Sequence, residues 1–275
     1  MNNFDIKRLG RLMQYTFVSD RSVFVKLITI WTVVFFLLFM LTLNAIKIRM
    51  GGFAGTYEAC LNNALGAANS VFIGFLMFEP CFIFSNLKRK QPRINFFMLP
   101  ATNLEKYIAR FLTVVFLWTL CCIIGFVAAD LLQWLVSFLI HPEATGLVMS
   151  QISDLNILST FSIHNSSMSG DLSKYSLITF IVVLILLFHS FCLLGGTFFR
   201  RHSWMLTVVL FIILNITLVA TASNVLANIN MQPLDPNVLF SILSAICVLF
   251  IMFNYWASYT IFRRMQIINN KWINL

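Results

Sequence analysis

The segment FVKLITIWTVVFFLLFMLTLNAI, residues Phe24 to Ile46, decides the fold class of this chain. A helix rises about 1.5 Å per residue and the hydrocarbon core of a bilayer is about 30 Å thick, so roughly 20 apolar residues cross it. Lys26, at the rim of the segment, is its one charged residue. The segment is too long for a signal peptide, follows a basic helical stretch and lacks a small-residue cleavage site. We therefore predict a transmembrane helix.

Apolar runs of similar length recur along the chain, and 59% of all residues are hydrophobic while 11% are charged. Soluble domains carry about 25% charged residues, and the mean hydropathy of +0.86 points the same way. The runs are continuous rather than alternating, which favours helices in lipid. We predict an all-α, polytopic membrane protein with a single transmembrane domain, residues 1–275, and six spans. The spans are expected at about 24–46, 70–87, 111–136, 177–199, 204–228 and 238–262.

The third apolar run extends from Phe111 to about Ile140. Thirty helical residues would measure about 45 Å, which exceeds the hydrocarbon thickness. The helix must therefore tilt, project outward, or end near Asp130 and continue as a surface helix. The sequence leaves these alternatives open.

The distribution of Lys and Arg predicts the orientation. With a cytoplasmic N-terminus, only Lys47, Arg49 and Lys174 of the 19 basic residues face outward. By the positive-inside rule, both termini are expected on the cytoplasmic side of the membrane. The expected membrane is a bacterial inner membrane. The net charge of +9 then reflects topology and attraction to anionic lipid, and no nucleic-acid partner is expected.

The first residues, 1–22, have the pattern of an amphipathic helix. On a helical wheel the basic residues oppose an apolar face, which predicts a helix lying in the inner membrane interface. A solvated basic tail is the alternative. The apolar face consists of Ile6, Leu9, Leu12, Met13 and Phe17.

A long basic segment, NLKRKQPRINFFMLPATNLEKYIAR, separates the second and third apolar runs at Asn86–Arg110. Its two prolines, Pro92 and Pro100, forbid one uninterrupted helix. Between them, Arg93–Leu99 is expected to form a short helix across the cytoplasmic face. Its aromatic and leucine side chains either dock into a groove of a soluble partner or pack under the protein's own helix ends.

Thr102 and Glu105 form a capping-box pattern directly after this short element. A helix is therefore expected to begin there and to run into the third span. Glu105 can accept hydrogen bonds from the start of its own helix, which the helix dipole also favours.

The stretch MLPATNLEKYIARFL, Met98–Leu112, resembles a segment of the permease subunits of type-2 ABC exporters. In that family a leucine-proline pair precedes Glu-Lys and then Arg at the start of the third span. The family also has an amphipathic interfacial helix, six spans, cytoplasmic termini and a short coupling helix that sits on a separate ATPase. The resemblance in layout extends over nearly the whole chain.

The resemblance implies two sets of site residues within the coupling segment, 88–104, and the helix start that follows it. Residues in or beside the ATPase contact would be Lys88, Arg89, Lys90, Arg93, Phe96, Phe97, Leu99 and Pro100. Residues that support the helix start would be Thr102, Glu105, Lys106 and Arg110. It also implies an ATP-binding cassette ATPase subunit and a second permease copy or paralogue as partners. The long outer loop expected at 141–175 departs from relatives in which this connection is short.

Ionisable residues inside apolar runs are costly and mark candidate functional positions. Glu79, Asp130 and His189 are such residues. Glu79 either lines a translocation path or forms a structural hydrogen bond, and Pro80 beside it predicts a kink. Asp130 is expected near the outer interface, and His189 is expected to bond between helices.

Motifs for nucleotide hydrolysis, serine hydrolysis and zinc proteolysis are missing from the sequence, so no catalytic residue, metal site or cofactor is expected. ATP would be bound by the partner subunit. The expected function is export of a substrate that the sequence does not identify. The alternative is a non-transporting membrane scaffold or sensor that recruits a cytoplasmic partner through the basic segment. An intramembrane enzyme would need Glu79, Asp130 and His189 to converge.

Overall fold

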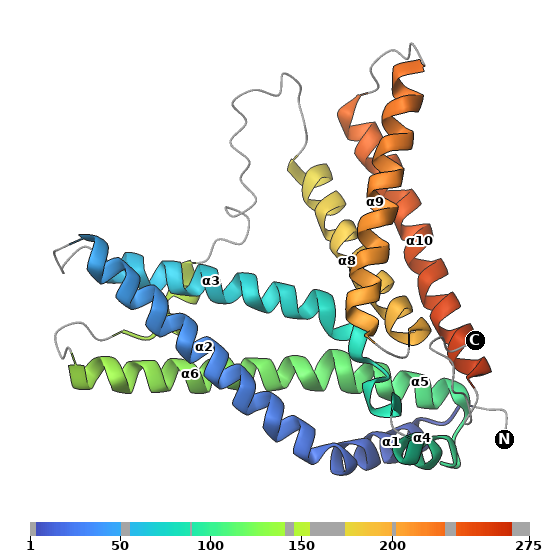
Figure 1. Ribbon diagram of the computed structural model, residues 1–275, viewed down its shortest axis with the longest axis horizontal. Coiled ribbons are helices and arrows are strands. Elements are labelled where there is room, and N and C mark those ends of the chain that lie inside the picture. The colour runs from blue at the N-terminus through green and yellow to red at the C-terminus, as the bar shows by residue number, and fades with distance from the viewer. Residues whose placement is uncertain are drawn as a thin grey trace. The chain divides into compact units, whose positions relative to one another are not determined.

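The computed structural model describes residues 4–50, 56–88, 90–140, 146–154, 174–199, 202–228 and 235–265. Within these residues every secondary-structure element is a helix (Figure 1). Five of the described helical segments are long and apolar enough to cross a membrane. The chain is therefore all-helical, with the character of a multi-pass membrane protein. The five segments are Arg21–Leu43, Glu58–Phe82, Asn103–Leu139, Tyr175–Phe198 and Asn237–Arg264.

The sixth expected span, 204–228, coincides with helix α9, Ser203–Asn228. Among the described side chains, its apolar part is the shorter helix Ser203–Thr217. A sixth crossing therefore stays a prediction. Of the expected outer loop, residues 141–145 and 155–173 lie outside the described part of the chain.

The chain divides into two compact units. Unit 1 comprises Met1–Met13, Met77–Val114 and Asn165–Leu275, and unit 2 comprises Gln14–Leu76 and Val115–His164. The first residues form helix α1, Ile6–Ser19, and its position in the membrane interface stays a prediction. Leu12 on its apolar face is buried, whereas Ile6 is 75% exposed.

Unit 2 is built from α2 (Arg21–Met50), α3 (Thr56–Phe78), α6 (Thr119–Ile140) and the short 3-10 helix η4 (Val148–Asp154). Its core combines large rings with very small side chains. Lipid gives helices no net hydrophobic drive to associate, so close approach of small residues matters. The buried core residues include Phe35, Phe39, Leu61, Ala64, Ala68, Cys122 and Ala129.

The second membrane-crossing helix starts and ends earlier than the expected span 70–87. Helix α3 begins at Thr56 and ends at Phe78, and the 3-10 helix η1, Glu79–Phe82, follows. Pro80 lacks a backbone N–H and ends the regular α-helical pattern. Asn62 and Asn63 lower the apolar character of the first turns, which is why the sequence pattern places the start too late.

The third apolar run is a continuous helical stretch. Helix α5, Asn103–Leu112, leads through a π-helical segment, η3, Thr113–Trp118, into α6. The helix continues beyond Asp130 to Ile140. A helix that leaves the membrane near Asp130 and continues along its surface would also extend to Ile140, so all three alternatives stay open.

Unit 1 contains α8 (Lys174–Phe198), α9 and α10 (Pro236–Arg264), and α8 packs against both α9 and α10 (Figure 1). Helix α8 also packs against η1. A Cβ atom at Gly196 would lie 2.7 Å from the carbonyl oxygen of Pro80, so only glycine permits this approach. The segment after η1 forms η2 (Ser85–Lys88) and helix α4 (Lys90–Phe97).

Candidate functional site

The start of α5 is closed by a complete capping box. The Thr102 Oγ1 accepts a hydrogen bond from the Glu105 N–H at 3.3 Å, and Glu105 Oε2 accepts one from the Thr102 N–H at 2.9 Å. The sequence prediction for this helix start is confirmed. Two of the four N–H groups that a helix start leaves without partners are thereby satisfied.

The other oxygen of Glu105 binds the N-terminal segment. Glu105 Oε1 accepts hydrogen bonds from the Asp5 N–H at 2.8 Å and from the Arg8 guanidinium at 2.9 Å. The Glu105 side chain is fully buried, while that of Arg8 is 21% exposed. A single carboxylate therefore joins α1 to the beginning of α5.

The first turns of α5 carry Glu105, Lys106 and Arg110 and precede the expected third span, 111–136. As one helix, the 37 residues Asn103–Leu139 would measure roughly 55 Å against a core of about 30 Å. Burial alone raises the pKa of Glu105, but the hydrogen bonds from Thr102 and Asp5 and the Arg8 charge hold that pKa below its ordinary value. The carboxyl group is therefore ionised at neutral pH.

Lys106 and Arg110 extend this network to the preceding segment. Lys106 Nζ donates to the Phe97 carbonyl at 2.8 Å, and Arg110 donates through Nε and Nη2 to the Ile83 carbonyl, each at 3.2 Å. Both cationic side chains are buried. Phe97 ends α4 and Ile83 follows η1, so the two cations satisfy carbonyls at helix ends.

A cluster of aromatic rings packs beside these bonds. The Phe262 ring of α10 stacks on Phe84 with ring centres 5.0 Å apart and on Phe97 at 5.9 Å. Tyr107 lies 5.7 Å from Phe262, and its hydroxyl shares a 2.9 Å hydrogen bond with Ser258. We call this set of polar and aromatic contacts the α4–α5 junction. Its residues are Asp5, Arg8, Ile83, Phe84, Phe97, Thr102, Glu105, Lys106, Tyr107, Arg110 and Phe262.

The expected partner-contact residues differ in their surroundings. Phe96 and Arg93 are buried, and Phe97 packs in the junction, which agrees with the alternative that these rings lie under the protein's own helix ends. Pro100 is exposed and Leu99 is partly buried. Arg89 and the side chains of Lys88 and Lys90 lie outside the described residues. The exposed face of α4 and its end instead presents Gln91, Pro92, Asn95 and Met98.

The polar residues within the apolar runs have structural surroundings. Glu79 is 1% exposed at the start of η1. Nearby in sequence, the Cys81 carbonyl accepts a 3.0 Å hydrogen bond from the Ser203 hydroxyl of α9. His189 Nδ1 lies 3.4 Å from the Tyr255 hydroxyl, which joins α8 to α10 as the sequence predicts.

Asp130 of unit 2 binds the backbone of η4. Its two carboxylate oxygens accept hydrogen bonds from the N–H groups of Val148 and Met149, each at 2.9 Å. The side chain is 2% exposed. The geometry assigns Asp130 a structural role in fixing η4 against α6.

The sequence pattern identified the buried polar residues but not the residues that bind them. Asp5 and Arg8 lie about a hundred positions from Glu105, and no pattern connects such distant residues. Phe262 belongs to the aromatic and basic stretch TIFRR at Thr260–Arg264, which is the one sequence signal at that end of α10.

In the comparisons with known proteins, no family model, no curated protein and no solved structure matches this chain. Among the described residues, His, Cys, Asp and Glu side chains form no group of three that could hold a metal ion. The functional argument therefore rests on the residues and their geometry.

Proposed function

We propose that this chain is the permease subunit of an ATP-driven exporter of the type-2 ABC class. It moves its substrate outward through a pathway formed with a second permease copy or paralogue, and a separate ATPase subunit supplies the energy. In this proposal α9 is a sixth span, both termini lie in the cytoplasm, and the membrane is a bacterial inner membrane. The motif at Met98–Leu112 and the five apolar helices support the proposal.

The proposal rests on helix α4, which is attached to the rest of the protein on one face and exposed on the other. One face is attached to α5 and α10 by the Lys106–Phe97 bond and by the Phe97–Phe262 ring contact. Asn95 and Met98 remain exposed, and Met98 is 74% exposed. A segment held on one side and free on the other can transmit a push from a bound ATPase to two helices. Such a push is the differential contact that couples nucleotide state to conformation.

The test is to search the genes beside this one for an ATP-binding cassette subunit and to co-purify that subunit with this chain. We expect a stable complex whose ATPase activity depends on the permease. Asn95→Trp, on the exposed face of α4, should weaken the complex, because a bulky ring disturbs a close protein contact. The matched control is Asn62→Trp, at an exposed position of α3, which should leave the complex intact. An unchanged complex with Asn95→Trp, or no complex with the wild-type chain, would refute the proposal.

A scaffold or sensor is the second candidate function. The burial of Glu79, which is 1% exposed, favours it, because a pathway residue should meet solvent in at least one state. Hydrogen exchange at the backbone amides of Glu79 and of residues 81–83 in the assembled complex separates the two functions. Transport predicts that ATP binding changes the exchange of these amides, whereas a scaffold predicts equal exchange with and without nucleotide.

A further inference from the structure

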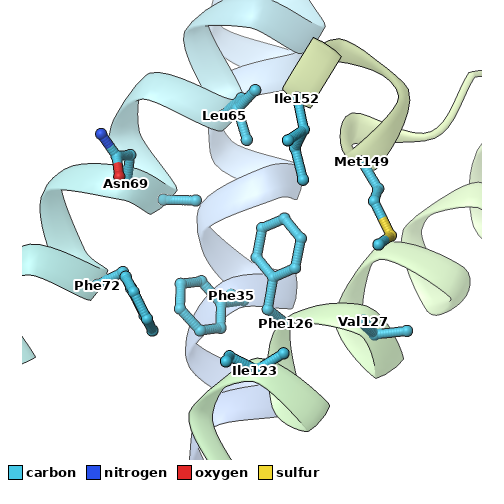
Figure 2. A pocket seen from close by; sticks show the side chains of 10 residues that line it. Phe35, Leu65, Asn69, Phe72, Ile123, Phe126, Val127, Met149 and Ile152 are labelled. Atoms are coloured by element: carbon cyan, nitrogen blue, oxygen red, sulfur yellow. The ribbon is translucent and has the colours of Figure 1, made fainter. Parts of the chain in front are cut away.

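Unit 2 contains a cavity of about 290 Å³ (Figure 2). Helices α2, α3 and α6 and the short helix η4 all contribute to its wall. Figure 2 shows Phe35 and Phe126 in the middle of the group and Met149 on one side of it. Of the 10 lining residues, Asn69 alone carries a side-chain amide, which Figure 2 shows to the left of the Phe35 and Phe126 rings and apart from them.

Three kinds of content can be compared for such a cavity. An empty cavity costs free energy in proportion to its volume. Its volume equals that of about ten water molecules, but each buried water needs two to four polar partners. Asn69 is the one polar side chain in the wall, so water has almost no partners there. A hydrocarbon chain would fill the cavity without losing hydrogen bonds, because it needs none.

The cavity opens to the surface of unit 2. Ile123 of α6 is 45% exposed, and Met149 and Ile152 of η4 are 49% and 44% exposed. Phe35, Asn69 and Ile123 of the cavity wall lie near the middles of helical segments that are long and apolar enough to cross a bilayer, so we expect lipid tails at the level of the cavity. The nearest source of hydrocarbon for the cavity is therefore an acyl chain of the surrounding lipid.

The wall formed by η4 is fixed rather than loose. Both oxygens of Asp130 hold the backbone of η4, and Val148 is fully buried in the core of the unit. Met149 and Ile152 belong to the same short helix and line the cavity (Figure 2). The cavity is thus a built part of the unit, present before a ligand enters.

We propose that unit 2 binds one acyl chain of a bilayer phospholipid in this cavity, with the mouth between α6 and η4. The site is independent of the transport proposal, because none of its residues belongs to the α4–α5 junction. It is a lipid site whether or not the chain exports a substrate.

The test uses the full-length protein in vesicles of phosphatidylcholine and phosphatidylglycerol that contain phosphatidylcholine with a diazirine midway along one acyl chain. After illumination, peptide mass spectrometry maps the adducts. We expect adducts on the peptides that carry Phe72 and Met149. Ala68→Phe fills the cavity and should lower these adducts about tenfold, the equivalent of displacing roughly two methylene groups from an apolar site. Ala67→Phe, one residue away on α3 and outside the cavity wall, is the matched control and should keep them.

A second variant guards against misfolding of Ala68→Phe, whose site is 2% exposed. Ile152→Trp blocks the mouth from a half-exposed position and should lower the same adducts, whereas Gln151→Trp should not. Unchanged adducts in Ile152→Trp would overturn the proposal. It would also be overturned if the Met149→Cys variant cross-linked two copies of the chain through the new thiol in high yield, because a second copy would then cover the cavity.

Discussion

In unit 2 the helices meet through rings and small side chains, whereas in unit 1 the helix ends meet through buried charged groups. Phe35 and Phe39 of α2 are fully buried against alanines of α3 and α6. In unit 1, Glu105, Lys106 and Arg110 are all at most 4% exposed, and each has a directed hydrogen bond. Close packing of side chains stabilises unit 2, and hydrogen bonds of buried charged groups stabilise the helix ends of unit 1.

The difference follows from the surroundings of each region. Helices within lipid gain little from apolar contact alone, so unit 2 depends on close fit. The α4–α5 junction instead contains helix ends, whose backbone groups lack partners within their own helices. The buried charged side chains of Glu105, Lys106 and Arg110 form hydrogen bonds with these backbone groups. Removing a charge should therefore harm unit 1 most, and adding a methyl group should be the harmful change in unit 2.

Glu105→Ala should give the largest effect. The substitution removes the acceptor of three hydrogen bonds and leaves Arg8 without its carboxylate. Because loss of one partner from a buried pair is strongly destabilising, we expect a loss of about 3 kcal/mol in unfolding free energy. Unfolding in mixed micelles measures it. Glu58→Ala, at an exposed position of α3, is the control and should change stability by less than about 0.5 kcal/mol.

The same carboxylate predicts a dependence on pH. The pKa of Glu105 is lowered in the folded protein, so its stabilisation is complete above the ordinary glutamate pKa of about 4.3 and is lost as the pH falls through the folded value. The stability difference between wild type and Glu105→Gln should stay constant from neutral pH to about 5 and shrink below about 4. A difference that is already smaller at pH 6 would contradict this role.

The capping box at Thr102 and Glu105 was predictable because its two residues are three positions apart. The remaining partners of Glu105 were not predictable, since Asp5 and Arg8 approach it only through the fold. Asp130 is a similar case: its partners in η4 follow 18 and 19 positions later in a stretch with no motif. Local patterns predict helix starts, and tertiary contacts determine what buried polar groups bind.

Asp130→Ala should give the next largest effect, and it tests whether unit 2 also depends on one polar group. The change leaves the Val148 and Met149 N–H groups without acceptors, so we expect a loss of about 2 kcal/mol. Hydrogen exchange should rise at these two amides and remain unchanged at α8. Unchanged exchange at η4 would show that the buried Val148 alone fixes it.

Gly125→Ala and Gly196→Ala compare the two regions directly. The new methyl would lie 2.6 Å from the Trp31 Cβ in unit 2 and 2.7 Å from the Pro80 carbonyl oxygen in unit 1. Neither neighbour is the flexible end of a side chain, so each variant should lose about 1.5 kcal/mol through overpacking. Gly66→Ala has no atom within 4 Å of its new methyl and should be neutral or stabilising by about 0.5 kcal/mol. Equal stability of all three variants would show that close fit holds neither unit.

Phe262→Leu should give the smallest effect and sharpens the comparison within unit 1. Leucine keeps most of the buried volume but removes the ring that stacks on Phe84 and Phe97. Aromatic pairs add about 1 kcal/mol beyond area burial, so the expected loss is of that order. Phe250→Leu, at a site of α10 that is 57% exposed, is the control. A loss well below that of Glu105→Ala would show that polar bonds, more than rings, attach α4 to α5 and α10, whereas an equal loss would assign that attachment to the aromatic cluster.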